Sequence, residues 1–194
     1  MRYYPVFLDL QGQSCVIVGG GAVAWRKAKV LLACGAQVTV VSPEVVRPLQ
    51  VLSRWRRLRW VPRRFKPGDL AHAFLVVAAT DDQPVNRAVS RGARRLRRLV
   101  NVVDQPALCS FIVPSIMRRG AITMAISTAG ASPALSKWLR QDLARRYGPP
   151  FARVLTRMRR WRTQVHRQTS SPQARKRRLE TLLQSELRRA GIRA

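Results

Sequence analysis

Apolar and polar positions alternate in two different ways along the chain. In the first 113 residues, short apolar runs are separated by amphipathic stretches, a pattern typical of parallel strands joined by helices. Strands are predicted at residues 15–18, 37–41, 58–61, 73–79 and 99–103. Helices are predicted at 22–34 and 83–98, the second with Val85, Val89 and Leu96 facing inward. This order predicts an α/β fold with a Rossmann-like parallel sheet.

The pattern changes after Asp104. Strands are predicted at 111–114 and 121–127, followed by a helix that begins at Ser132-Pro133 and ends near Tyr147. Beyond Gly148, two further helices each place apolar residues on one face, and these are Val154, Met158, Trp161 and Val165, then Leu179, Leu183 and Leu187. We therefore expect three parts, at residues 1–113, 114–148 and 149–194.

A glycine-rich segment joins the first predicted strand to the first predicted helix. Residues 19–24 satisfy the pattern G-x-G-x-x-A. Gly19 allows a tight turn, and Gly21 lets the backbone approach a pyrophosphate, which the free N–H groups at the helix N-terminus then bind. This context predicts a dinucleotide site at Gly19, Gly20, Gly21, Ala22 and Val23. The alternative interpretation is a glycine turn that binds nothing.

The acidic residue that usually follows the second strand of such a fold is displaced in this chain. Ser42 occupies the usual place, followed by Pro43, and Glu44 lies two residues further on. Ser42 can hydrogen-bond a ribose hydroxyl, whereas Arg47 can meet a 2′-phosphate. These residues favour NAD over NADP but leave NADP open.

Acidic residues are scarce, with nine Asp and Glu against 37 Lys and Arg. Asp104 follows the last predicted strand of the sheet, at the edge where ligands of open α/β folds bind, and it is the candidate catalytic residue. Its alternative role is to form the turn before Gln105. Asp82 is better interpreted as a helix N-cap. His72 and His166 belong to no ligand cluster, and the three separated cysteines predict neither a disulfide framework nor a metal site.

The net charge of +28 should attract polyanions. Residues 151–194 are the densest part, with 13 Lys and Arg against two acids. A nucleic-acid or anionic-surface binding protein is therefore the alternative from another functional class, although only Phe151 and Trp161 are available there for base stacking. The simpler interpretation places these arginines on solvated helix faces. With no long apolar run and no secretory signal, a cytoplasmic protein without membrane contact is expected.

Six segments carry a resemblance to a known family. They are Tyr4 to Leu8, Val16 to Ala28, Ala79 to Asp82, Asn101 to Asp104, Phe111 to Ile116 and Ser127 to Pro133. In this order they closely resemble the precorrin-2 dehydrogenase/sirohydrochlorin ferrochelatase family, which includes the amino-terminal half of siroheme synthase. Trp25 and Thr128 depart from the family's usual residues. The resemblance covers roughly residues 3–147 and implies an NAD-binding domain, a central dimerisation region, a helical carboxyl-terminal region and a homodimer.

The implied activity is NAD-dependent oxidation of precorrin-2 to sirohydrochlorin, followed in many members by insertion of ferrous iron to give siroheme. The family's essential aspartate maps onto Asp104. Its NAD contacts map onto Gly21, Ala22, Val23, Pro43 and Glu44, and we add Gly19, Gly20, Ser42 and Thr80 as cofactor-binding candidates. Because the substrate is an octacarboxylate, we expect Arg118, Arg119, Ser127 and Thr128 to help bind it.

Overall fold

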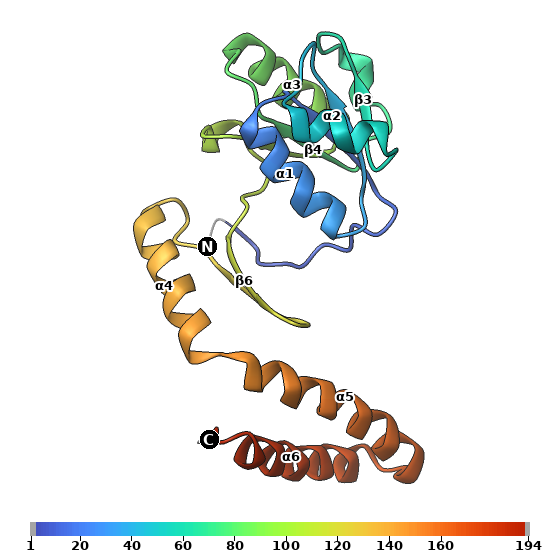
Figure 1. The fold of residues 1–194 in the computed structure, drawn as a ribbon, viewed down its shortest axis with the longest axis vertical. Coiled ribbons are helices and arrows are strands. Elements are labelled where there is room, and N and C mark those ends of the chain that lie inside the picture. The colour runs from blue at the N-terminus through green and yellow to red at the C-terminus, as the bar shows by residue number, and fades with distance from the viewer. Residues whose placement is uncertain (1–2, 193–194) are drawn as a thin grey trace. The chain divides into compact units, whose positions relative to one another are not determined.

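The structure is a computed structural model that describes residues 3–192. The chain divides into two compact units, Met1–Val113 and Pro114–Ala194, shown in blue to green and in yellow to red in Figure 1.

The first unit contains a five-stranded parallel sheet, as the hydrophobic pattern predicts. Its strands are β1 (Ser14–Val18), β2 (Gln37–Val41), β3 (Arg59–Val61), β4 (Leu75–Ala78) and β5 (Leu99–Val102). They lie in the order β3-β2-β1-β4-β5, so the strand order reverses between β1 and β4. In this register Ile17 lies beside Val40 on one side and Val77 on the other. The Rossmann-like α/β fold is thereby confirmed.

Helices cover both faces of this sheet, which is why its strands are apolar on both sides. One apolar cluster joins Cys15 and Ile17 to α1 (Ala22–Ala33) and α2 (Arg47–Arg54). The other joins Val16 and Val18 to α3 (Gln83–Arg95) and the 3₁₀ turn η1 (Pro67–Leu70). A second 3₁₀ turn, η2 (Pro106–Leu108), follows β5. Alternate residues of each strand therefore belong to different cores.

The helix ends of the first unit confirm two local predictions and correct two. Gly35, at φ +79°, follows the end of α1, and Asp82 caps α3 by accepting the Val85 N–H at 3.0 Å. The inward orientation predicted for Leu96 is wrong, because α3 ends at Arg95 and Leu96 is 41% exposed. Helix α2 was not predicted from the sequence.

The second unit begins with an antiparallel hairpin of β6 (Ser115–Arg119) and β7 (Ile122–Ile126). The strand predicted at 111–114 is wrong. Pro114 has no N–H to donate to a ladder, and the pairing begins one residue later, at Ser115. The carbonyl of Phe111 instead accepts a hydrogen bond from the side chain of Asn101 at 3.2 Å.

Three helices complete the second unit: α4 (Pro133–Arg146), α5 (Pro149–Gln168) and α6 (Pro172–Arg189). Ser132 caps α4 as predicted, accepting the Leu135 N–H at 3.1 Å. Each of the three helices has Pro at its first turn, where the missing N–H costs no hydrogen bond. None of the helices in the described part of the chain combines the length and apolar character needed to cross a membrane.

A buried acid holds α5 against α6, which lie side by side in Figure 1. The side chain of Glu186 is 3% exposed. It accepts the indole N–H of Trp161 at 3.1 Å and pairs with the guanidinium of Arg157 at 2.5 Å. Val154 and Val165 are the buried apolar residues of α5. The α5–α6 packing therefore combines apolar contacts with a buried ion pair.

Candidate active site

The glycine turn lies at the carboxyl ends of β1 and β4, where the strand order reverses. Gly19 has φ +117°, and a Cβ there would collide with the Ala79 carbonyl. A Cβ at Gly20 would collide with the Glu44 carbonyl, whereas one at Gly21 would meet nothing within 4 Å. The first two glycines are thus required by the packing of the turn itself, and Gly21 faces open space.

Helix α1 begins directly after this turn. Gly21 is its N-cap and has no side chain to cap the helix. The N–H groups of Ala22, Val23 and Ala24 precede the first helical hydrogen bond, donated by Trp25 to the Gly21 carbonyl at 3.0 Å. These donors and the positive end of the helix dipole form an anion site with room for a phosphate.

The residues after β2 lie beside the turn. The backbone N–H of Val46 donates to the Gly20 carbonyl at 2.9 Å, which ties this segment to the glycines. The carbonyl of Ser42 accepts the indole N–H of Trp60 at 2.9 Å. Pro43 and Glu44 are exposed. After β4, Thr80 is half-buried and its hydroxyl accepts the Asp82 N–H at 3.0 Å.

Asp104 lies in the turn after β5, at the same carboxyl edge. It has φ +58°, a left-handed conformation that Asp tolerates better than most residues. Its carboxylate is exposed and has no hydrogen bond or ion pair within residues 3–192. The conformation agrees with a turn-forming role, but the unpaired carboxylate leaves Asp104 able to contact a ligand.

Cys109 holds the backbone on both sides of this turn. Its Sγ accepts the Val102 N–H at 3.1 Å and lies 3.3 Å from the Gln105 carbonyl. The side chain of Gln105 donates in turn to that of Gln83. The turn that carries Asp104 is therefore fixed to β5 and to the start of α3.

No role at the site was predicted for Lys27, which lies on α1. Its ammonium is half-buried, and burial lowers its pKa, as does neighbouring Arg26, while Asp104 and Cys109 act to raise it. The spacing in the sequence could not reveal this, because 77 residues separate Lys27 from Asp104. The signal that could have found it is a polar residue beside the buried Ala24 and Ala28.

The four predicted substrate-binding residues lie in the second unit. Arg118 and Arg119 end β6, and the guanidinium of Arg119 donates to the Ala144 carbonyl at 3.2 Å. Ser127 accepts the Ala129 N–H, and the Thr128 hydroxyl accepts the Ser132 N–H at 3.2 Å. Ser127 and Thr128 therefore stabilise the turn before α4.

The thiol of Cys15 is buried in the first unit. Burial raises the pKa of the Cys15 thiol to about 11, and nearby Cys34 adds to the rise, so the thiol stays protonated and is a poor nucleophile. Within residues 3–192, no three His, Cys, Asp or Glu side chains gather as a metal-binding group.

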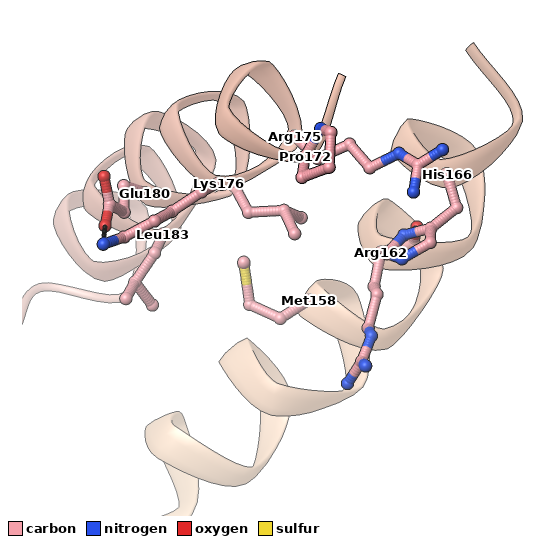
Figure 2. Close-up of a pocket in the computed structure, with 9 residues that line it drawn as sticks. Met158, Arg162, His166, Pro172, Arg175, Lys176, Glu180 and Leu183 are labelled. Atoms are coloured by element: carbon pink, nitrogen blue, oxygen red, sulfur yellow. Dashed lines mark hydrogen bonds and ion pairs between the residues drawn. The ribbon is translucent and has the colours of Figure 1, made fainter. Parts of the chain in front are cut away.

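A groove of about 490 Å³ lies between α5 and α6, and none of the predicted site residues is among those that line it (Figure 2). Met158 projects from α5 toward α6, and Leu179 and Leu183 complete its apolar lining. Arg162, Arg175 and Lys176 are at the rim, where Lys176 pairs with Glu180 at 4.0 Å. The groove is a feature of the helical hairpin rather than of the sheet edge.

Comparison with known proteins follows the same division of the chain. Residues 6–115 match a family described as putative NAD(P)-binding, and residues 119–146 match one described as sirohaem biosynthesis protein central. A solved structure of SirC, a precorrin-2 dehydrogenase, superposes with a TM-score of 0.81 at 30% identity and covers 97% of this chain and 99% of its own. The chain belongs to the precorrin-2 dehydrogenase family.

Members of this family also occur within longer proteins. The siroheme synthase of Nitrosospira multiformis is 43% identical over 188 residues, and that of Nitrosomonas eutropha is 41% identical over 185. Each alignment covers 95% of this chain, but only 40% and 39% of the respective relative. The chain thus spans about two fifths of these siroheme synthases. Family membership favours a tetrapyrrole enzyme over the nucleic-acid-binding alternative.

Proposed function

We propose that this chain oxidises precorrin-2 to sirohydrochlorin with NAD as the hydride acceptor. The supporting observation is the carboxyl edge of the sheet, where an open helix N-terminus and an unpaired Asp104 carboxylate occur in one unit. The membership of the precorrin-2 dehydrogenase family supplies the substrate class.

The residues of the glycine turn fit a dinucleotide. A Cβ at Gly21 would meet open space, and the N–H groups of Gly21, Ala22 and Val23 are available for a pyrophosphate. Ser42, Pro43 and Glu44 would lie by the adenosine ribose, with Thr80 on the β4 side of the cofactor. Bound NAD supplies a two-electron acceptor that takes a hydride.

Asp104 accepts the proton in this proposal. Converting precorrin-2 to sirohydrochlorin removes one hydride, which leaves with the nicotinamide, and one proton, which needs a base. The exposed carboxylate of Asp104 can take that proton and release it to water. The left-handed turn fixes the backbone of the base, since Cys109 and Gln83 hold its two flanks.

The substrate carries eight carboxylates, and the second unit offers basic groups to bind them. Arg118, Arg119, Ser127 and Thr128 remain the predicted contacts there. In the second half of the proposal, ferrous iron is a substrate that is inserted into sirohydrochlorin, and Asp104 accepts the displaced pyrrole protons. Iron insertion is the part that the oxidation assay alone cannot establish.

We also propose a cytoplasmic homodimer formed through residues 114–148. The second unit buries only Met117, Val154 and Val165 among its apolar residues in the described part of the chain. It leaves Leu135 48% and Trp138 53% exposed on α4. A unit with so small a core gains apolar burial from a second copy.

The test is conversion of precorrin-2 by the purified chain with NAD, followed by Fe²⁺ or Co²⁺, with absorbance recorded at each step. In the Asp104→Asn variant we expect both steps to fall by about 100-fold or more, because the proton acceptor is lost. NAD affinity and the dimer should not change. The matched control is Glu180→Gln, an exposed acid of α6, which should convert precorrin-2 at the wild-type rate.

Two results would contradict this proposal. An absence of NAD-dependent conversion by the wild type excludes the dehydrogenase function. Wild-type turnover by Asp104→Asn removes Asp104 from the mechanism but leaves the activity in place.

A further inference from the structure

Lys27 is a half-buried cation that the fold itself does not neutralise. It lies on the second turn of α1, between Ala24 and Ala28, both of which are fully buried at 0% exposure. Within residues 3–192, its ammonium makes no hydrogen bond or ion pair. Unpaired cations normally extend into water, so a half-buried one requires another explanation.

The direction of the side chain follows from helix geometry. Side chains on an α-helix lean toward its N-terminus, and the N-terminus of α1 is at the carboxyl edge of the sheet. Lys27 therefore reaches back toward the edge that carries Asp104. The electrostatic effect of Asp104 and Cys109 on the Lys27 ammonium agrees with this direction.

Asp104 lies apart from the pyrophosphate site along this edge. The first-turn N–H groups that face the pyrophosphate follow β1, whereas Asp104 and Cys109 follow β5, and β4 lies between these two strands. Adjacent strands are about 4.8 Å apart, so the two sites are roughly 10 Å apart along the edge. The acidic neighbour of Lys27 is on the side where the proton is to be removed.

We propose that Lys27 binds a carboxylate of the tetrapyrrole substrate and thereby holds the ring beside Asp104. This inference rests on the proposed function. An ammonium whose charge is disfavoured by burial gains more from a carboxylate than an exposed arginine does, because water screens the contact less. The substrate, with eight carboxylates, can supply that partner while leaving Asp104 free to accept the proton.

The experiment compares Lys27→Met, Lys27→Arg and Lys29→Met. The control residue, Lys29, is exposed on the same helix, with its Nζ 5.1 Å from the centre of the Trp25 ring. For Lys27→Met we expect the KM for precorrin-2 and the Kd of the product sirohydrochlorin to rise about 10- to 100-fold, as for loss of a charged hydrogen bond. The Kd of NAD and the thermal midpoint should stay at wild-type values.

Two further variants test whether the effect depends on the positive charge and on the position of Lys27. Lys27→Arg should recover most of the product affinity, because a guanidinium can also bind a carboxylate. Lys29→Met should bind product like the wild type. Product binding is measured by absorbance titration without NAD, so it does not depend on turnover.

Three outcomes would overturn the assignment. Lys27→Met that binds product as tightly as the wild type excludes a substrate contact. A raised Kd for NAD with unchanged product binding places Lys27 in the cofactor site instead. If the wild type itself binds no product, the proposed contact between Lys27 and the product is excluded. If the wild type binds product but shows no NAD-dependent conversion, the proposed function fails and the product contact of Lys27 is still decided by the titration.

Discussion

The first unit buries apolar side chains on both faces of its sheet, whereas the second unit buries few apolar side chains and has many exposed arginines on its helices. Within residues 3–192, all but three of the buried apolar residues belong to the first unit. In the second, the carboxylate of Glu186 is buried together with few apolar side chains, and it pairs with Arg157. Burial of apolar surface thus stabilises the first unit, and a specific ion pair contributes to the second.

The second unit, residues 114–194, has 19 Lys and Arg against three acids, which is +16 of the net charge of +28. Acids in the second unit are already paired, since Asp142 contacts Arg146 and Glu186 contacts Arg157. Other arginines of α5 and α6, such as Arg159 and Arg177, are exposed. The simpler interpretation of these charges as solvated helix faces agrees with the structure.

The largest effect is expected in the first unit, from Gly19→Ala. The new Cβ would collide with the Ala79 carbonyl while the backbone keeps φ +117°, so the free energy of unfolding should fall by about 3 kcal/mol or more. Urea unfolding followed by circular dichroism measures this change.

Gly21→Ala is the matched variant for this prediction. Its Cβ meets nothing within 4 Å, so the loss of stability should stay below about 1 kcal/mol, the usual cost of alanine at a helix N-cap, while the Kd of NAD rises. Equal stability of the two variants would show that the turn does not constrain the first unit as described.

A smaller effect is expected in the second unit, from Glu186→Ala. Removal of the buried acid leaves Arg157 and the Trp161 indole without their partner, which should cost about 2 kcal/mol. Thermal unfolding followed by Trp fluorescence measures it. Glu180→Ala removes an exposed acid of the same helix and should change the midpoint by less than a degree or so. If the two variants melt alike, the ion pair does not stabilise the hairpin.

The smallest effect concerns the Arg63–Asp69 pair at the surface of the first unit. Hydrogen bonding to Arg63 lowers the pKa of Asp69, whose carboxylate lies 2.6 Å from the guanidinium. Because the folded pKa is below the unfolded value of about 3.9, this stabilisation is present above that pH and is lost as the pH falls through the folded pKa. Asp69→Asn should therefore melt slightly below the wild type at pH 7. The two midpoints should converge as the pH falls through the folded pKa of Asp69, and a constant difference would exclude the charge as its cause.

The sheet could be predicted from sequence because each strand is an apolar run between turn residues. Helix α2 was missed because its apolar pattern is weak. It buries a single residue, Leu49, and it begins with Arg47 and Pro48 and ends with Arg54. The strand predicted at 111–114 failed for a different reason. Phe111 to Val113 have strand-forming side chains. However, the Phe111 carbonyl accepts a hydrogen bond from the Asn101 side chain, and the strand pairing begins only after Pro114, at Ser115.

The candidate site was predictable only where one local segment carries the chemistry. The glycine turn is such a segment, and Asp104 stood out because acids are scarce. The partial burial of Lys27 depends on the packing of α1 against the sheet, which no local pattern encodes. The local hydrogen bonds of Ser127 and Thr128 could not be predicted from the sequence either, because they depend on the conformation of the turn before α4.

The three glycines of the turn differ in what would preserve them over evolutionary time. Selection for a folded protein alone is enough to retain glycine at positions 19 and 20, because a side chain there would strike the chain's own backbone. A side chain at position 21 would meet nothing within 4 Å, so the packing of the turn does not exclude one there. A descendant that kept this fold but lost its cofactor would be free to drift at position 21 first. The residue found there therefore reports on function, while its two neighbours report on folding.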